Sequence, residues 1–480
     1  MGFRHGPMFG RFSPGLLGVL TTAYYRLTPG TLKFSLFPPR YVKRTFVDSA
    51  CHFLLFIALG FVALVPNAPH AAFVAAAVGA NWAFLFDHQQ WIAGHGPTYA
   101  YVLAAGCYPS SSGALACAQL HVMLVWIGCG LGKVGPWFQF VNGPFLTASV
   151  CLRGRDWFWR AAVNGKNNLR PTPLLRSISS LAAYIEWGAP LMLFSAVPGI
   201  TRVGLAIMVL MHMYINFAPA VYDVYAWNFW FVAAAPIMFG GGPTLSMGVD
   251  FAGLSVAPRW MLMWVLLEFA YIWYGLLFPR NSPYNANHRH WAGNWPNGLV
   301  LIRKEAAEKL VKPWVVPGQP HWSPPPPWVQ ALLSKFGQSV ENYELRMFKV
   351  MGHFWNVSMN MKVMPVLVQR ALAGRSVSDF YILQIQQFAD LFMGSPNWTH
   401  RIPELTVAVG GPTQLEHGDC LCVWVGPFPF RFGTFRGMHA WKIVDAKAGV
   451  VAEGEITLER AWALSGLPSD SERAEAILQS

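Results

Sequence analysis

The sequence predicts a polytopic α-helical membrane protein of about eight transmembrane helices, with a C-terminal extra-membrane domain of helices and a small antiparallel β-sheet. Composition is the first observation: 54% of the 480 residues are hydrophobic and only 12% are charged, whereas about 25% are charged in soluble domains. The second is that the charged residues lie between apolar runs, as in multi-pass membrane proteins. The third is a change near residue 280 to polar, proline-rich and then strand-like sequence.

Eight apolar runs are candidates for the membrane helices. Several are shorter than the ~20 residues that cross a bilayer perpendicularly, which leaves room for one re-entrant segment, and the third run is the weakest candidate. No signal peptide of ordinary form is expected ahead of them, because the first thirty residues hold only a short apolar stretch at 16–20. The runs cover about 44–65, 70–86, 98–108, 115–132, 180–197, 203–217, 225–239 and 260–278.

Loop charges predict the orientation of these helices. Basic residues at 33–44 precede the first run, and the loop at 153–176 holds six basic residues against one acid, Asp156. We expect both segments in the cytoplasm, which requires an even number of crossings between them, eight spans in all and a cytoplasmic C-terminus. The net charge of +12 then reflects topology and contact with anionic lipid rather than nucleic-acid binding, in a multi-pass protein of the bacterial inner membrane.

Composition divides the chain into four parts. A basic N-terminal segment at 1–43 precedes a transmembrane domain at 44–279. A polar segment and proline-rich linker follow at 280–327, and a C-terminal domain, helical and then β-rich, occupies 328–480.

The last two parts have their own expected elements. Residues 303–312 resemble a short helix, and 328–393 carry apolar residues at helical spacing. Alternating apolar residues then predict the strands of an antiparallel sheet at 405–409, 420–425, 441–444 and 450–456.

The seven cysteines include two notable pairs. Cys107 and Cys117 flank a Ser/Gly-rich loop expected outside, so a disulfide is the alternative to two ordinary buried thiols. Cys420 and Cys422 lie two apart on a predicted strand and share one face. Their spacing fits no usual zinc ligand pair, and the histidines of the chain do not form the repeated boxes of diiron sites. We therefore predict no metal.

Lys133 is the residue that best indicates a functional site. It ends the apolar run from Leu115, where an ammonium is costly unless it snorkels to water or serves a site. Snorkelling is the alternative on spacing alone. Other ionisable groups in or beside apolar runs favour a buried polar pocket: His95, Tyr99, His121, Glu186 and His212.

The chemistry of these groups suggests roles. A lysine in an apolar setting loses proton affinity, because desolvation disfavours its charged form, and can then act as a general base. We expect Lys133, His95 and His212 to be the catalytic residues of one cavity. The alternatives are that each tryptophan is an interfacial anchor and that the buried acids pair with basic groups across helices. The expected substrate-binding residues are Tyr99, Trp126, Trp137, Glu186, Asn216, Trp227 and Asn228.

Three motifs resemble, in order and spacing, the vitamin K-dependent gamma-carboxylases, which belong to the horizontally transferred transmembrane (HTTM) domain group. They are Gln90-Trp-Ile-Ala-Gly-His-Gly-Pro-Thr-Tyr-Ala-Tyr101, Val125-Trp-Ile-Gly-Cys-Gly-Leu-Gly-Lys-Val-Gly-Pro-Trp137 and Val209-Leu-Met-His-Met-Tyr-Ile-Asn216. Asn228 and the block His290-Trp-Ala-Gly-Asn-Trp295 more closely resemble a family of uncharacterised bacterial transmembrane proteins. The resemblance covers about residues 45–295.

The resemblance implies a role for Lys133 in particular. In the carboxylases, the matching lysine deprotonates a reduced quinone, and oxygenation of that quinone drives carboxylation of a glutamate. It also implies that His95 is a site histidine and that a reduced quinone is a substrate. This chain has a single lysine, Lys133, at the position where the family often has two. It also has Gly135-Pro136 where the family has acidic residues. Its short strand-rich tail is expected in the cytoplasm, so protein carboxylation is not expected.

Two classes of function remain. The first is an integral-membrane enzyme that acts on a quinone or isoprenoid by lysine/histidine acid–base chemistry, as an oxygenation or a cyclisation. The second is a non-catalytic membrane assembly subunit or lipid carrier, in which the polar groups hold helices together. The expected partners are membrane lipids and a lipophilic small molecule, with no nucleic acid.

Overall fold

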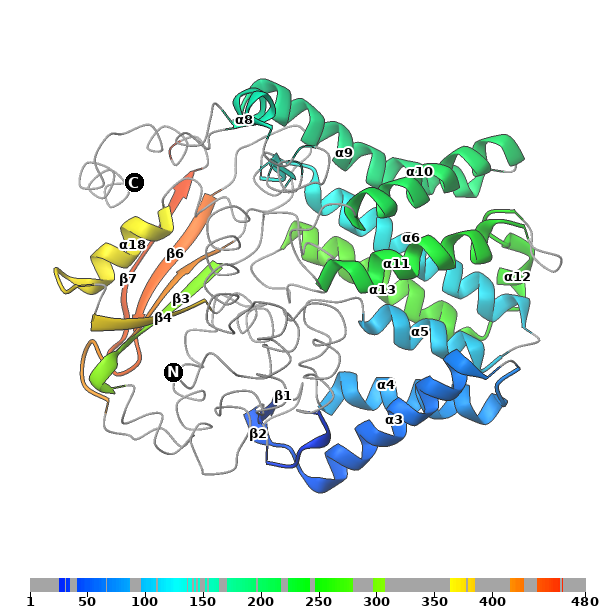
Figure 1. The fold of residues 1–480 in the computed structure, drawn as a ribbon, viewed down its shortest axis with the longest axis horizontal. Helices are drawn as coiled ribbons and strands as arrows, with labels where there is room; N and C mark the ends of the chain where they lie inside the picture. Colours follow the sequence, from blue (N-terminus) through cyan, green and yellow to red (C-terminus); the bar gives the residue numbers. More distant parts are fainter. Residues whose placement is uncertain are drawn as a thin grey trace.

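A bundle of helices and a β-sheet that lies beyond one end of it make up the described part of the chain (Figure 1). The coordinates are a computed structural model. It describes residues 26–30, 32–34, 41–65, 67–86, 96–108, 111–135, 137–139, 142–143, 146, 152, 155–163, 171–195, 197–216, 223–241, 247–278, 297–306, 363–376, 379–384, 415–426, 438–457 and 460.

Each of the eight predicted membrane segments contains a helix. Among the described residues, α3, α6, α10 and α13 are long and apolar enough to cross a membrane. The helices are α3 (Phe46–Leu64), α4 (His70–Phe86), α5 (Gly96–Gly106), α6 (Ser112–Lys133), α9 (Pro173–Leu191), α10 (Pro198–Asn216), α11 (Asp223–Phe239) and α13 (Arg259–Leu277). Three shorter elements accompany them: α8 (Asp156–Val163), the 3₁₀ turn η3 (Met192–Phe194) and α12 (Phe251–Ser255).

Helix α9 begins seven residues before its expected start, and the local sequence explains why. The Thr172 side chain accepts a hydrogen bond from the backbone N–H of Leu175 at 3.3 Å, which caps the helix. Pro173 follows at the first helical position, where its missing N–H costs nothing. Polar residues between 173 and 180 interrupt the apolar pattern, so the pattern alone places the start too late.

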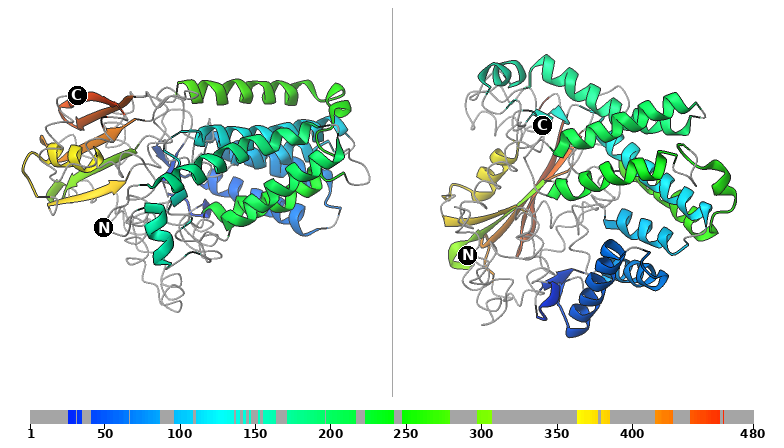
Figure 2. Two further views of the ribbon diagram at one scale, coloured as in Figure 1. Left: turned by 90° about the horizontal axis from the view of Figure 1, so that it is seen from above. Right: turned by 45° about the vertical axis from the view of Figure 1, so that its right-hand side comes forward.

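The eight long helices run alternately in opposite directions along the bundle (Figures 1 and 2). The ends of α3, α5, α9 and α11, and the starts of α4, α6, α10 and α13, lie at the end far from the sheet. The chain therefore enters α3 and leaves α13 at the end nearest the sheet.

Helix α6 is the centre of the bundle. Of its most apolar 18-residue window 78% is buried, against 22–28% for α3, α10 and α13. Small residues such as Ala114 and Ala118 let the neighbouring helices approach it, and Val122 and Trp126 fill the core beside Phe231. The outer helices present exposed apolar side chains, as helices that face lipid do.

Gln119 of α6 ties this core to the α11–α13 connection. Its Nε2 donates to the carbonyl oxygens of Met238 and Gly248, at 2.5 and 3.1 Å, and its Oε1 accepts from the backbone N–H of Asp250 at 3.0 Å. A buried amide that satisfies three backbone groups fixes the connection in place.

The sheet is antiparallel with strand order β4-β3-β5-β6-β7. Helix α18 (Val363–Leu372) packs against β5. The strands are β3 (Asn297–Arg303), β4 (Phe380–Gln384), β5 (Cys420–Val425), β6 (Met438–Asp445) and β7 (Gly449–Thr457). A separate antiparallel pair, β1 (Leu32–Phe34) and β2 (Tyr41–Lys43), precedes α3.

The structure confirms three predicted strands and corrects two expected helices. The segments at 420–425, 441–444 and 450–456 are β5, β6 and β7, whereas 405–409 lies outside the described residues. The helical interpretation of 328–393 is wrong at Phe380–Gln384, which pairs as strand β4 with β3. The expected helix at 303–312 is wrong at its first residue, which ends β3. Both errors have one cause: the partner strand, not local periodicity, selects the extended conformation.

The cysteine alternatives are also decided for the first pair. Cys107 and Cys117 are both free, so the disulfide is excluded and the interpretation as ordinary thiols holds. The Cys107 thiol donates to the Leu103 carbonyl at 3.5 Å.

Cys420 and Cys422 yield a prediction about thiol reactivity. Both are buried in β5, and burial raises the pKa of the Cys420 thiol from 9.0 to about 12, with help from the charges of Asp445 and Asp419. Burial likewise raises the pKa of Cys422. Because only the thiolate reacts, raising the pKa lowers the reactive fraction of Cys420 about a thousandfold at any pH below 9. In the folded full-length protein at pH 8, iodoacetamide should leave both unmodified by mass spectrometry, and denaturant should expose both. Equal labelling with and without denaturant would contradict their burial.

Candidate functional site

Lys133 and Glu186 form a buried ion pair between the last turn of α6 and the last turns of α9. Both carboxylate oxygens of Glu186 lie 2.5 Å from Lys133 Nζ, and the two side chains are 10% and 9% exposed. Gly130 makes this approach feasible, because a Cβ there would overlap the backbone of Trp187. Lys133 therefore pairs with a carboxylate inside the protein and does not snorkel to water.

The segment that follows α6 folds over this pair. Trp137 Nε1 donates to the Gly132 carbonyl at 2.9 Å, and the Phe138 ring centroid lies 5.3 Å from Lys133 Nζ. Further along, Asn142 Nδ2 donates to the Ser179 hydroxyl of α9 at 3.1 Å. Trp137, Phe138 and Asn142 are all buried. Two aromatic rings and an anchored loop thus shield the pair from the end of the bundle that faces the sheet.

A second buried polar pair lies deeper in the bundle. His212 of α10 places Nδ1 2.6 Å from Asn228 Oδ1 of α11. Its ring stacks on Phe231 with centroids 4.7 Å apart and tilts against Trp126 at 5.9 Å. His212 Nε2 and Trp126 Nε1 are buried and have no hydrogen-bond partner within the structure described. Two unpaired ring nitrogens in one aromatic setting are the feature by which a polar group of a ligand would be held.

Helix α6 connects the two pairs. Trp126 and Lys133 are seven residues apart, so they lie on the same face about 10 Å from each other along the helix. The expected convergence of Lys133, His95 and His212 on one cavity stays a prediction, because His95 lies outside the described residues.

A third buried pair joins α6 to α13. His121 of α6 forms an ion pair with Glu268 of α13, and the Tyr101 ring stacks on His121 with centroids 4.4 Å apart. The Tyr101 hydroxyl donates to the Met261 carbonyl at 2.7 Å. His121 precedes Lys133 by twelve residues, about 18 Å along α6. Glu186 and Glu268 each pair with a basic side chain of another helix. Such pairing was the alternative to a catalytic role in the sequence analysis.

The remaining expected residues divide into three groups. His95 lies outside the described residues, and the side chains of Tyr99 in α5 and Trp227 in α11 do so too. Trp137 donates a hydrogen bond to the Gly132 carbonyl next to the ion pair. Asn216 ends α10 with its Oδ1 buried and unpaired among the described groups. No cluster of three His, Cys, Asp or Glu side chains able to hold a metal ion occurs among the residues that are described.

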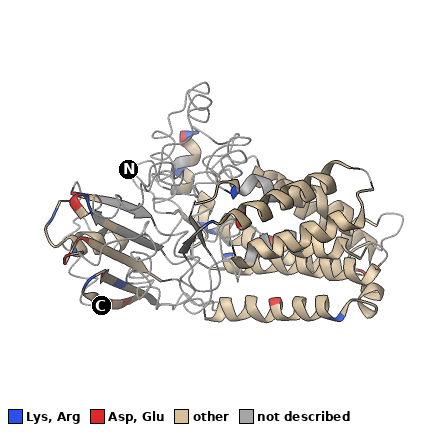
Figure 3. Cartoon of the chain, turned by 90° about the horizontal axis from the view of Figure 1, so that it is seen from below, with Lys and Arg blue, Asp and Glu red and all other residues tan. Residues whose placement is uncertain are grey.

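Charged residues are sparse along the helices of the bundle and more frequent on the sheet (Figure 3). This distribution makes the paired groups inside the bundle the exception there. Ionisable residues in membrane segments are costly and commonly mark a functional site.

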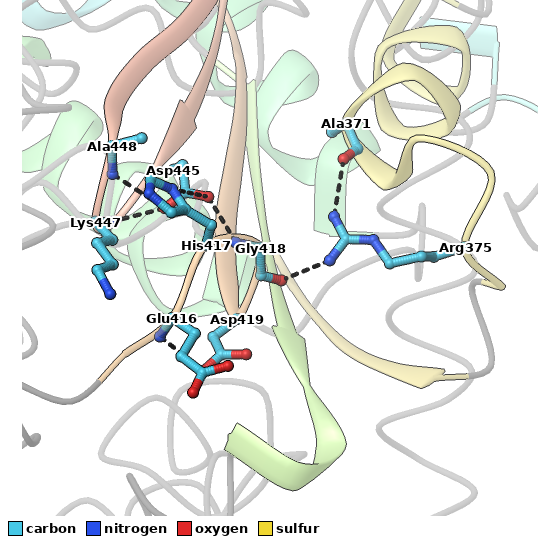
Figure 4. A network of polar contacts seen from close by, with 9 residues as sticks. All are labelled: Ala371, Arg375, Glu416, His417, Gly418, Asp419, Asp445, Lys447 and Ala448. Carbon is cyan, nitrogen blue, oxygen red and sulfur yellow. Dashed lines mark hydrogen bonds and ion pairs between the residues drawn. The ribbon is translucent and has the colours of Figure 1, made fainter.

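A polar network also joins the sheet to α18, but its groups are used structurally (Figure 4). Asp445 accepts from the backbone N–H groups of Gly418, Lys447 and Ala448 at 2.7, 2.8 and 3.2 Å. Arg375 donates to the Leu372 and Gly418 carbonyls at 2.9 and 3.1 Å. Gly418 has φ +81° and a Cβ there would collide with the Arg375 guanidinium. The network therefore fixes a turn.

Comparison with known proteins gives one match. The chain belongs to the family described as transmembrane protein of unknown function (DUF3556), whose model matches residues 1–470. No curated protein and no solved structure matches it. The family and the apolar helices together identify a multi-pass membrane protein. The matching family is neither the HTTM group nor the gamma-carboxylases.

Proposed function

We propose that this member of a transmembrane family is a membrane enzyme that acts on a lipid-soluble substrate, a quinone or an isoprenoid, inside the helical bundle. The observation that carries the proposal is the buried Lys133–Glu186 pair beside the unpaired nitrogens of His212 and Trp126. A substrate from the lipid phase would reach these groups without passing through water.

The pair can act as an acid and a base together. Lys133 Nζ and a Glu186 carboxylate oxygen lie 2.5 Å apart, so one group can accept a substrate proton while the other donates one. In the uncharged form of the pair, the Lys133 amine takes a proton from a substrate O–H or C–H. Glu186 gives its own proton to the substrate in a later step, which leaves the Lys133 ammonium beside a carboxylate that balances its charge. Removal of a proton by Lys133 begins the oxygenation of a quinol by dioxygen, whereas donation of a proton from Glu186 to a double bond begins the cyclisation of an isoprenoid.

His212 and Trp126 would hold the substrate's polar group. When His212 Nδ1–H donates to Asn228 Oδ1, Nε2 is a hydrogen-bond acceptor, and the indole N–H of Trp126 is a donor. A hydroxyl group satisfies both, because it donates and accepts. A carbonyl would satisfy Trp126 alone.

The resemblance to the gamma-carboxylases enters the proposal through Lys133, and through His95 as a site histidine. In that comparison Lys133 corresponds to the base that deprotonates a reduced quinone. The chain departs from it in pairing Lys133 with Glu186, which makes the acid part of the catalytic unit rather than of the substrate-binding set. We retain an HTTM-like membrane domain at 44–279 as part of the proposal.

The topology we propose has eight spans with both ends in the cytoplasm of a bacterial inner membrane. The alternation of the eight helices supports it, as does the location of the basic loop region around α8 at the same end as the sheet. The domain boundary at 279 completes this proposal, and β3, which pairs with β4 and β5, joins residues 297–303 to the C-terminal sheet.

A second candidate is a non-catalytic assembly subunit or lipid carrier. The observation that favours it is that the pairs of α6 join it to α9 and to α13, as structural polar contacts between membrane helices do. Under this alternative Lys133→Arg should serve about as well as lysine, since only the charge is needed. A guanidinium stays protonated, so the same variant should be inactive if Lys133 exchanges protons.

Retention of a lipid-soluble ligand tests the proposed site. Full-length protein purified in mild detergent should carry a quinone or prenyl lipid, identified by mass spectrometry of its extract. Trp126→Phe removes the indole N–H of the site together with part of the ring system, and should lower retention at least roughly tenfold, the effect of one lost hydrogen bond in a buried site. The control, Trp260→Phe, removes an indole whose N–H bonds to the Tyr108 hydroxyl near the opposite end of the bundle. Identical lipid content in the wild type and Trp126→Phe would argue against this site.

A further inference from the structure

We propose that α8 is an interfacial helix that binds the headgroups of anionic phospholipids through Arg155 and Arg160. The proposal concerns a surface outside the bundle and does not depend on the proposed enzymatic function. It rests on the two faces of α8, on how the helix is fixed, and on where it lies.

The two faces of α8 differ sharply. Phe158 and Ala162, one turn apart, are buried and pack on Leu175 of α9. Trp157 and Arg160, also one turn apart, are exposed, the indole by 61%, and Arg155 beside them is exposed as well. An amphipathic helix with tryptophan and arginine on its free face is typical of segments that lie in the headgroup layer.

Hydrogen bonds from Thr172 hold α8 against α9. The Thr172 hydroxyl donates to the carbonyls of Ala161 and Ala162 at 2.5 and 3.1 Å, and the Thr172 N–H donates to Ala162 O at 2.9 Å. The last turn of α8 and the first turn of α9 thus share one threonine. This joint fixes which face of α8 is free, and the exposed arginines cannot turn inward.

Position and charge identify the occupant. Helix α8 lies at the start of α9, at the sheet end of the bundle (Figures 1 and 2). The loop 153–176 that contains it has six basic residues and one acid. An exposed indole on α8, with exposed Arg160 one turn on and exposed Arg155 just before the helix against the single acid Asp156, matches a phospholipid with a negative headgroup. The indole enters the boundary of the acyl chains while the guanidinium groups meet phosphate.

Native mass spectrometry of the full-length protein tests the proposal. Detergent-purified protein is incubated with an equimolar mixture of phosphatidylglycerol and phosphatidylcholine, and the bound lipids are counted. The wild type should prefer phosphatidylglycerol, and Arg155→Gln/Arg160→Gln should lower that preference roughly fivefold per arginine. The matched control, Arg202→Gln/Arg259→Gln, alters two exposed arginines at the opposite end of the bundle and should leave it unchanged.

Two further measurements separate the outcomes. Trp157→Ser should shorten the retention of both lipids alike, because the indole contributes apolar contact rather than headgroup selection. Inorganic phosphate at 10-fold excess over lipid should not displace phosphatidylglycerol. An unchanged preference in the α8 double variant, an equal loss in the control, or displacement by phosphate would each overturn the proposal.

Discussion

Lys133→Met should lower the free energy of unfolding by about 3–5 kcal/mol, because it leaves the Glu186 carboxylate buried without its cation. Glu186→Met should have a similar effect by leaving the ammonium unpaired. The double variant Lys133→Met/Glu186→Met should recover most of this loss, since two apolar side chains of similar size can replace a buried pair at little cost. Reversible unfolding in detergent, followed by circular dichroism, measures all four states of the cycle.

Two results of this double-mutant cycle would contradict the prediction. If either single change costs less than about 1 kcal/mol, the pair behaves as an exposed salt bridge, and its burial by Trp137 and Phe138 is wrong. If the double variant is as unstable as the single ones, the contact of α6 with α9 depends on the charges themselves.

Gly130→Ala should destabilise the contact between α6 and α9. A Cβ at this position would overlap the backbone nitrogen and Cα of Trp187, which cannot move aside as a flexible side chain can. We expect a loss of about 1–3 kcal/mol from overpacking, together with separation of Glu186 from Lys133. Thermal unfolding measures the first effect.

Gly188→Ala is the matched control, because no atom lies within 4 Å of the position that a Cβ would take there. It lies on the same helix as Glu186, and alanine stabilises a helix interior by roughly 0.5–1 kcal/mol relative to glycine. Equal effects of the two alanines would show that α6 and α9 do not meet closely at Gly130.

The sequence predicted the positions of the helices well and the contacts among them poorly, and of the described helices α3, α6, α10 and α13 are long and apolar enough to cross a membrane. Apolar runs mark where a helix is stable in lipid, so each of the eight predicted segments contains one. Lys133, Glu186 and His212 were visible as rare ionisable groups in those runs. Which of them pair could not be read from spacing, because Lys133 and Glu186 are 53 residues apart and meet through helix packing alone.

The errors outside the bundle have the same origin. Strand β4 has a sequence that fits a helix, and its pairing with β3 decides its conformation. The role of Gln119 was also missed, because a polar residue in an apolar run gives no sign of which backbone groups it will satisfy. The start of α9 could have been found, since Thr172-Pro173 is a recognisable helix beginning.

The most direct test of the central claim, that the buried pair performs chemistry, is a lipid profile of cells. A strain lacking the gene is supplied with the wild type or with the stable double variant Lys133→Met/Glu186→Met at equal membrane abundance, and the lipid extracts are compared by mass spectrometry. We predict that the double variant gives the same profile as the strain with an empty vector, with a substrate accumulated and a product absent. A profile identical to that of the wild type would contradict the claim and leave the pair a structural contact between α6 and α9.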